Sequence, residues 1–273
     1  MGIYQPFSFF AVGWRHRQLI RRLSWRRIQA RYRGTVLGRC WVVIQPLLLL
    51  SVYTFVFSVV FEARWGSSEA SGVGRYEFAL FLFSGILLFS IFSECVNTAP
   101  QSIVENQVYI RQLKFPVEVF AWVTVFTSLF TFAIGLLILG LFYFVIYGFP
   151  PESWVYLPVA ILPVVLLTLG LVWFISSLSV YFRDTAQITT VLTTALFFLS
   201  PIFYPASRIP EAFRDIYFLN PLASLIEMFR GALLSNAVPD PWILMQTLLV
   251  GWVVAWFGFV WFMKTKRGFS DVL

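Results

Sequence analysis

Residues 119–147 read VFAWVTVFTSLFTFAIGLLILGLFYFVIY and contain no charged side chain. A helix needs about 20 consecutive apolar residues to cross the hydrocarbon core of a bilayer, so this stretch is long enough to span it. Its extra length predicts a helix that tilts or protrudes beyond the bilayer. The stretch therefore predicts a transmembrane helix and indicates an integral membrane protein.

Five further apolar blocks accompany this one. Apolar residues make up 59% of the 273 residues and charged residues only 12%, too few to cover a water-soluble domain of this size. Each block is continuously apolar instead of alternating, which excludes a closed β-barrel. We predict an all-α integral membrane protein with a single transmembrane domain, residues 41–263, whose six helices span about 41–61, 78–99, 119–147, 154–180, 186–203 and 241–263.

Basic residues set the expected orientation. Fifteen of the 20 Lys and Arg residues lie in residues 1–40, the 100–118 loop, the 181–185 turn and the C-terminal tail 264–273. Loops rich in Lys and Arg stay on the cytoplasmic side of the membrane. Both termini and the 100–118 loop are therefore expected in the cytoplasm, and the arginines that precede the first apolar block argue against a cleaved signal peptide.

The N-terminal stretch WRHRQLIRRLSWRRIQARYRG, residues 14–34, is basic but not cleanly amphipathic. As a helix it has two apolar stripes on nearly opposite faces, one of Leu19, Ile20 and Leu23 and one of Trp14, Trp25 and Ile28. One interpretation is a basic flank that only fixes orientation. The other is a helix at the cytoplasmic interface within segment 1–40, with one stripe on lipid and the other on a protein partner. Nucleic-acid binding is the weakest interpretation, because no domain accompanies the charge.

The loop ENQVYIRQLKFPVE, residues 105–118, carries more apolar surface than a plain connection needs. Arg111 and Lys114 are three residues apart and share one helical face. Pro116 marks a break before the next span. This pattern favours a short helix that docks into a partner protein.

Residues 204–240 are too polar to cross the membrane, yet they contain apolar pieces. Asn220 followed by Pro221 is typical of a helix N-cap and first helical residue, so a short helix is expected through Leu234. Its charged residues lie among Phe and Leu, which favours a hairpin that dips into the outer interface.

Aromatic residues make up 19% of the chain. Most are expected to face lipid or to form interfacial belts. For any single aromatic residue, packing inside the protein is the default interpretation. An aromatic path also suits sugars, whose C–H faces pack on rings while their hydroxyls stay wet. The candidates for such a path in spans one, two and five are Tyr53, Phe57, Phe83, Phe89, Phe92, Phe197, Phe198, Phe203 and Tyr204.

Several motifs are missing from the sequence. It has no GxxxxGK[ST] phosphate loop, no GxSxG or HExxH motif and no Cys/His cluster, so no catalytic residue, cofactor or metal is expected in this chain. Glu94 is the one acidic residue firmly inside an apolar block. An intramembrane carboxylate is a functional candidate, although snorkelling or a local hydrogen bond explains it equally well.

Five ordered motifs resemble those of ABC-2-type permeases, most closely the membrane subunit of O-antigen and teichoic-acid exporters. They are RYRGTVLGRCWVVIQPLL (31–48), SGILLFSIFSECV (84–96), ENQVYIRQLKFPVEV (105–119), YFRDTAQI (181–188) and FFLSPIFYP (197–205), the last followed by LNPL (219–222). The resemblance implies a homodimer with two separate ATPase subunits, which bind ATP and Mg. It also implies re-entrant helices over residues 206–236 and a coupling helix over 105–116. The residues it implies for ATPase coupling are Glu105, Asn106, Arg111, Lys114, Phe115, Pro116, Arg183 and Asp184.

The resemblance further implies a substrate and a location. The substrate is a glycan on an undecaprenyl pyrophosphate carrier, exported across the bacterial inner membrane. Guanidinium groups suit phosphate oxygens, so the residues expected to receive the pyrophosphate at the cytoplasmic mouth are Arg31, Tyr32, Arg33 and Arg39.

Other functions remain open at this point. The exported substrate could be teichoic acid, capsular polysaccharide or a small drug-like molecule. A membrane glycosyltransferase or O-antigen ligase is the alternative from a different class, although the 206–240 stretch has few acidic residues for such an enzyme. A structural scaffold would not need a docking loop. Co-purification with an ATPase subunit discriminates between these functions.

Overall fold

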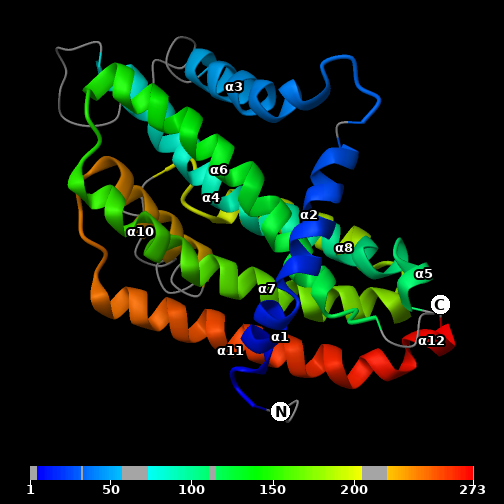
Figure 1. Ribbon diagram of the computed structural model, residues 1–273. Coiled ribbons are helices and arrows are strands. Elements are labelled where there is room, and N and C mark those ends of the chain that lie inside the picture. The colour runs from blue at the N-terminus through cyan, green and yellow to red at the C-terminus, as the bar shows by residue number, and fades with distance from the viewer. Residues whose placement is uncertain (1–4, 32, 57–72, 111–114, 205–219, 273) are drawn as a thin grey trace.

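The structure is a computed structural model that describes residues 5–31, 33–56, 73–110, 115–204 and 220–272. Every regular element in these residues is helical, and the long helices lie side by side (Figure 1). The elements are α1 Ser8–Arg15, α2 Arg17–Arg31, η1 Gly38–Cys40, α3 Trp41–Tyr53, α4 Val73–Val104, α5 Gln107–Ile110, α6 Val119–Tyr147, η3 Glu152–Tyr156, α7 Leu157–Tyr181, α8 Thr185–Leu199, α10 Pro221–Leu234, α11 Pro241–Thr265, η5 Lys266–Gly268 and α12 Phe269–Val272.

Four helical segments are long and apolar enough to cross a membrane: Glu77–Val104, Val119–Tyr147, Glu152–Tyr181 and Pro241–Gly268. They correspond to the second, third, fourth and sixth predicted spans. The first and fifth are represented by the shorter apolar helices Trp41–Val56 and Thr185–Leu199. The end of the predicted first span and the aromatic candidate Phe57 lie outside the described residues.

Helix α8 ends four residues earlier than predicted. Ser200 is extended, with φ −89° and ψ 152°, and it precedes Pro201. A residue before proline is pushed out of the helical region because the proline ring collides with its backbone. The apolar run up to residue 203 therefore continues beyond the helix as a turn.

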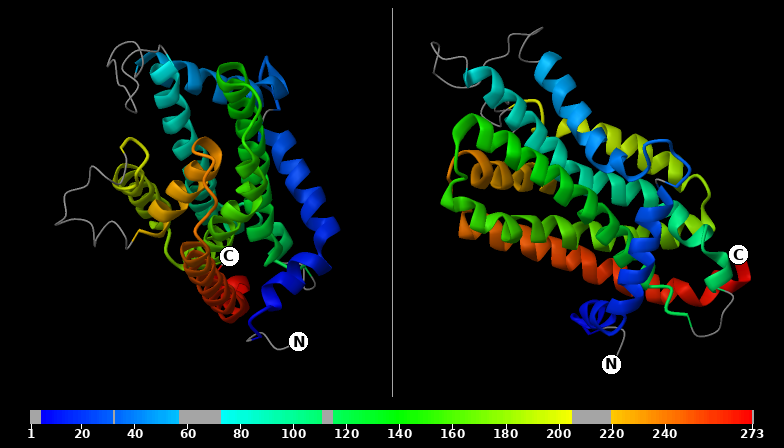
Figure 2. Two further views of the ribbon diagram at one scale, coloured as in Figure 1. Left: turned by 90° about the vertical axis from the view of Figure 1, so that its left-hand side faces the viewer. Right: turned by 45° about the horizontal axis from the view of Figure 1, so that its top comes forward.

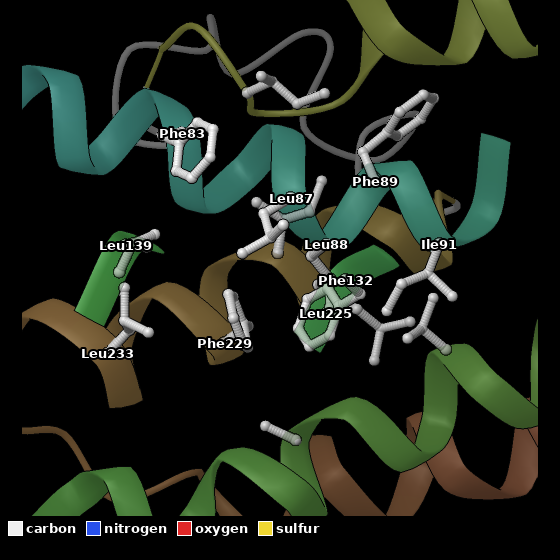
Figure 3. Close-up of a cluster of buried hydrophobic side chains, with 14 of the residues drawn as sticks. Phe83, Leu87, Leu88, Phe89, Ile91, Phe132, Leu139, Leu225, Phe229 and Leu233 are labelled. Carbon is white, nitrogen blue, oxygen red and sulfur yellow. The ribbon is translucent and has the colours of Figure 1, made fainter. Parts of the chain in front are cut away.

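Helices α4 and α7 occupy the centre of the bundle, and α10 packs against both. Figure 3 shows part of this core, where Leu88 and Ile91 of α4 lie near Phe132 of α6 and Leu225 and Phe229 of α10. Burying such side chains inside a membrane protein stabilises it mainly through close van der Waals packing.

Helix α10 begins where the sequence predicted. Asn220 Oδ1 accepts a hydrogen bond from the backbone N–H of Leu222 at 3.0 Å, and Pro221 is the first helical residue. The Asn220 side chain also donates to Ser200 Oγ at 3.0 Å, which fixes α10 to the turn after α8. The remainder of the predicted re-entrant hairpin, residues 206–219, lies outside the described residues.

Two groups of connections lie at opposite ends of the bundle. At one end Ser179 Oγ donates to the Pro100 carbonyl at 2.8 Å, and Lys266 Nζ lies 2.6 Å from Glu118 Oε2. Helices α5 and α12 lie at this end (Figure 1). At the other end Trp154 Nε1 donates to the Leu233 carbonyl at 3.0 Å. Connections therefore lie at both ends of the bundle, and the six-span topology and the assignment of the first end to the cytoplasm stay predictions.

The N-terminal helices cross the bundle on its outside. Ile20 of α2 is buried against Val119 and Val123 of α6, with Leu19 and Leu23 beside it. One predicted apolar stripe of α2 is therefore covered by this same chain and not by a partner protein.

Candidate functional site

The predicted coupling segment follows directly from the end of α4. Asn106 Nδ2 donates to the Ser102 carbonyl at 2.8 Å, and the Tyr109 N–H donates to the Asn106 carbonyl at 3.0 Å, which starts the short helix α5. Glu105 is exposed. Arg111 and Lys114 lie outside the described residues, so their common face is untested.

Contacts among three aromatic rings hold the coupling segment against α6. Tyr109 and Phe115 have ring centroids 4.8 Å apart, and Phe115 and Phe120 are 5.5 Å apart. Pro116, next to Phe115, is half-buried. The Phe115 ring thus packs inside this chain and positions the segment, while the exposed Glu105 remains available to a partner.

A second exposed turn joins α7 to α8. Arg183 and Asp184 are both exposed. The Asp184 carbonyl accepts from the N–H groups of Gln187 and Ile188 at 3.0 and 3.1 Å, which starts α8. Because Ser179 of α7 bonds to the end of α4, this turn lies at the same end of the bundle as the coupling segment.

Arginines of α2 fasten that helix to the bundle. Arg26 Nη1 donates to the Tyr109 hydroxyl at 3.0 Å, which connects α2 directly to the coupling segment. Arg27 Nη1 donates to Thr124 Oγ1 at 2.9 Å. Burial lowers the pKa of the Arg27 guanidinium, and the Glu105 carboxylate opposes this shift. Sequence reasoning missed both arginines, because their partners lie 83 and 97 residues away along the chain.

Arg31 forms an ion pair with Glu94 of α4, and its other nitrogen donates to Thr131 Oγ1 at 3.4 Å. This pair explains how Glu94 is tolerated within an apolar helix. Arg33, also predicted at the pyrophosphate site, is exposed. Tyr32 and the side chain of Arg39 are not described, so the structure does not test whether the four predicted residues form one cluster.

Most of the predicted glycan-path aromatics gather between α4 and α8. Phe89 contacts Phe197 with a centroid distance of 5.3 Å, and Phe197 contacts Phe203 at 5.2 Å. Figure 3 shows Phe89 on the side of α4 away from Leu88 and Ile91. The Tyr204 hydroxyl donates to the Phe198 carbonyl at 3.3 Å, and burial raises the pKa of this tyrosine.

The other aromatic candidates differ in exposure. Phe198 is 62% exposed, whereas Phe83 and Phe92 are buried and Tyr53 is half-buried. Phe83 and Phe92 therefore pack within the protomer in this conformation. Among the candidates that the structure describes, Phe198 has the ring that is open to a passing molecule.

Helix α8 carries a polar stripe on its exposed face. Gln187, Thr190, Thr194 and Phe198 are exposed and recur at intervals of three or four residues, which places them on one side of a helix. The hydroxyls of Thr190 and Thr194 donate to the carbonyls four residues earlier at 2.9 and 2.8 Å. The stripe combines satisfied hydroxyls with an aromatic ring, and the exposed apolar side chains of Ile188, Val191, Leu192 and Leu199 lie beside it on the same helix.

Arg230 of α10 is buried, with 6% of its surface exposed. Its guanidinium donates to the carbonyls of Pro201 and Ile202 at 2.9 and 3.3 Å and lies over the Phe81 ring. It also borders a cavity of about 450 Å³ that Glu77 and other polar residues of α4, α6 and α10 line. Arg230 was expected at the outer interface. The sequence of α10 alone does not predict this burial, because the carbonyls that accept hydrogen bonds from Arg230 belong to the turn after α8.

Comparisons with known proteins agree on one family. The family model for the ABC-2 type transporter matches residues 18–234. The chain is 30% identical over 264 residues to the O-antigen export system permease protein RfbA of Myxococcus xanthus, covering 94% of this chain and 96% of that protein. It is 28% identical over 248 residues to RfbA of Klebsiella pneumoniae, covering 90% and 91%. The chain is 21% identical over 217 residues to the polysialic acid transport protein KpsM of Escherichia coli, covering 79% of this chain and 81% of that protein.

Proposed function

The chain belongs to the ABC-2 type transporter family, and from this premise we propose that it is the permease of a polysaccharide exporter in the bacterial inner membrane. ATP hydrolysis takes place on a separate ATPase subunit, present in two copies with two copies of this chain. This chain has no catalytic role of its own. Both of its termini face the cytoplasm with the ATPase.

One observation carries the coupling part of this proposal. The coupling segment and the Arg183–Asp184 turn lie at the same end of the bundle and expose charged side chains there. Arg26 joins the coupling segment to α2, and Arg31 joins α2 to α4. A movement of the docked ATPase would therefore reach α4, which contacts α8 through Phe89 and Phe197. ATP binding shifts the population between a closed and an open arrangement of these helices.

The glycan moves along the exposed face of α8 in this proposal. Gln187, Thr190, Thr194 and Phe198 offer hydroxyls and a ring to successive sugars. A second copy of the chain, with its own α3 and α8, completes the channel. Polar residues on an outer helix face are tolerated at membrane depth where they line a water-filled cavity.

The proposed substrate is an O-antigen polysaccharide on an undecaprenyl pyrophosphate carrier. The relatives named for O-antigen export are 30% and 28% identical to this chain, against 21% for the polysialic acid transport protein. Arg31, Tyr32, Arg33 and Arg39 receive the pyrophosphate, and Arg31 exchanges Glu94 for a phosphate oxygen when it does so. A capsular polysaccharide or teichoic acid is the alternative substrate.

The coupling assignment is tested with Phe115→Ala in the complex with the ATPase, purified into lipid vesicles. Loss of the ring removes two aromatic contacts and lets the coupling segment shift. We expect glycan export per ATP hydrolysed to fall by at least about fivefold while ATP hydrolysis continues. Phe149→Ala is the matched control, since Phe149 is 87% exposed at the opposite end of the bundle.

Two results would contradict the proposal. Wild-type export per ATP in Phe115→Ala would remove the coupling role of the segment. Failure of the chain to co-purify with an ATPase would remove the separate ATPase subunit from the proposal.

A further inference from the structure

A groove of about 1380 Å³ lies between the N-terminal helices and the first half of α6. Its floor is aromatic, with Trp122, Phe126 and Phe130 of α6 facing Trp25 and Ile28 of α2. A groove with this lining offers apolar contacts to a hydrocarbon chain.

The same groove is lined by cations. Arg17, Arg21 and Arg22 border it, and Arg17 and Arg21 are one helical turn apart on α2. The Arg17 guanidinium lies 5.0 Å from the centre of the Trp14 ring. Within the described part of the chain, no carboxylate forms an ion pair with any of the three arginines. The groove therefore has an excess of positive charge next to its apolar floor.

Two buried polar atoms beside the groove add a separate observation. Ser24 has 6% of its surface exposed, and its hydroxyl has no hydrogen-bond partner among the residues that the structure describes. The same holds for Trp122 Nε1. Both residues line the groove. A buried polar group without a partner is costly, so an occupant that offers oxygen acceptors would stabilise this arrangement.

We propose that this groove binds a resident anionic phospholipid from the leaflet at the coupling-segment end. The phosphate lies among Arg17, Arg21 and Arg22, and ester or glycerol oxygens reach Ser24 and Trp122. The acyl chains lie along the aromatic floor. Anionic headgroups are attracted to basic residues at the membrane surface, and the aromatic rings supply the apolar contact that a soluble anion would not need.

The occupant is a structural lipid and not the exported glycan carrier. The groove is lined by residues of α1, α2 and α6 only, whereas the proposed glycan path runs along α8 and α3. Figure 2 shows α2 and α8 on opposite sides of the bundle. The contacts of α2 with Thr124 and Glu94 also close the bundle between the two regions. The residues proposed to receive the carrier's pyrophosphate begin at Arg31, beyond the groove-lining part of α2, so the groove is a separate site from the one proposed for the carrier.

The test uses the complex with its ATPase, depleted of lipid and then exposed to vesicles of phosphatidylglycerol or phosphatidylcholine. Native mass spectrometry counts the lipid retained after transfer to detergent. We expect wild-type protein to retain phosphatidylglycerol in preference to phosphatidylcholine. Arg17→Gln/Arg21→Gln should lower this retention by at least about tenfold. Arg15→Gln/Arg267→Gln, which removes two exposed charges outside the groove, should retain it like wild type.

A second variant tests whether lipid retention depends on the groove itself and not only on the net charge of the protein. Ile28→Trp fills the floor without changing charge and should also reduce retention of phosphatidylglycerol. Equal retention of both lipids by wild type, or equal loss in the groove and control charge variants, would overturn the proposal. Displacement of the bound lipid by undecaprenyl pyrophosphate at equal concentration would also overturn it, because the groove would then be a carrier site.

Discussion

At the scale of single residues, the pair between Arg31 and Glu94 fixes the basic outer helix α2 to the central helix α4. The side chains of Arg31 and Glu94 keep 33% and 21% of their surface exposed, and Thr131 accepts a second hydrogen bond from Arg31. Removing one partner of such a pair leaves the other charge poorly hydrated and unpaired. The loss of folding stability is then larger than the net stabilisation that the pair provides.

A double-mutant cycle on this pair tests its role. We expect Glu94→Gln and Arg31→Gln each to lower the free energy of unfolding in detergent by about 1–3 kcal/mol, with the double variant losing less than the sum. Glu152→Gln, at an exposed position at the other end of the bundle, is the control. Thermal unfolding measures all four proteins against wild type. Strictly additive losses would show that the two side chains do not interact.

The sequence indicated Glu94 as a special carboxylate but did not identify its partner. Arg31 lies 63 residues away, and only the crossing of α2 over the bundle brings it near α4. The same limit applies to Phe115, whose place in the coupling segment was predicted but whose packing on Tyr109 and Phe120 was not. Local pattern indicates which residue types are unusual, whereas tertiary packing decides what they contact.

At the scale of helices, α7 and α11 pack extensively against each other, and their backbones approach closely at glycines. A Cβ atom added at Gly258 would overlap the backbone of Gly170, and one added at Gly251 would lie 2.8 Å from the Pro163 carbonyl oxygen. Inside a membrane, small residues allow helix backbones to approach closely, and the gain is van der Waals contact over the whole interface.

Gly258→Ala is therefore expected to force α11 away from α7 and to destabilise the protein by about 1–3 kcal/mol. Gly231→Ala is the matched control, because its added methyl group would meet Ala237 Cβ at an ordinary 3.5 Å. Alanine also favours a helix over glycine by about 1 kcal/mol, so this control should be neutral or stabilising. Unfolding of both variants in detergent gives the comparison. Equal stability of Gly258→Ala and wild type would mean that the close approach is not needed.

Helix boundaries were predictable wherever a local signal sets them. The uncharged run 119–147 coincides with α6, and the Asn220–Pro221 pair starts α10 as predicted. Hydropathy alone overextended the fifth span, because Pro201 ends α8 while the apolar residues continue. It did not indicate that the Pro201 and Ile202 carbonyls hold the Arg230 side chain inside the protein. Apolar composition reports where a segment lies in the bilayer but not where its backbone bends.

At the scale of the whole molecule, α8 lies at one side of the bundle (Figure 2), and the side chains of its polar stripe are exposed. Gln187 lies three residues after Asp184, at the coupling-segment end, and Thr190, Thr194 and Phe198 follow it along the helix. In the proposed function a second protomer encloses this face around water, so that the glycan meets these side chains.

Thr190→Val/Thr194→Val tests this path directly. Valine has nearly the shape of threonine, and both hydroxyls already bond within α8, so folding and assembly with the ATPase should persist. The path loses two hydroxyls that exchange hydrogen bonds with sugars and water, and we expect the glycan export rate to fall by about 5–30-fold. Thr247→Val in α11, whose hydroxyl also bonds within its own helix, is the control. Export is measured in vesicles as glycan moved per complex, together with ATP hydrolysis. Unchanged export in the double variant would show that the glycan does not contact this face of α8, because the variant leaves the rest of the channel wall as it was.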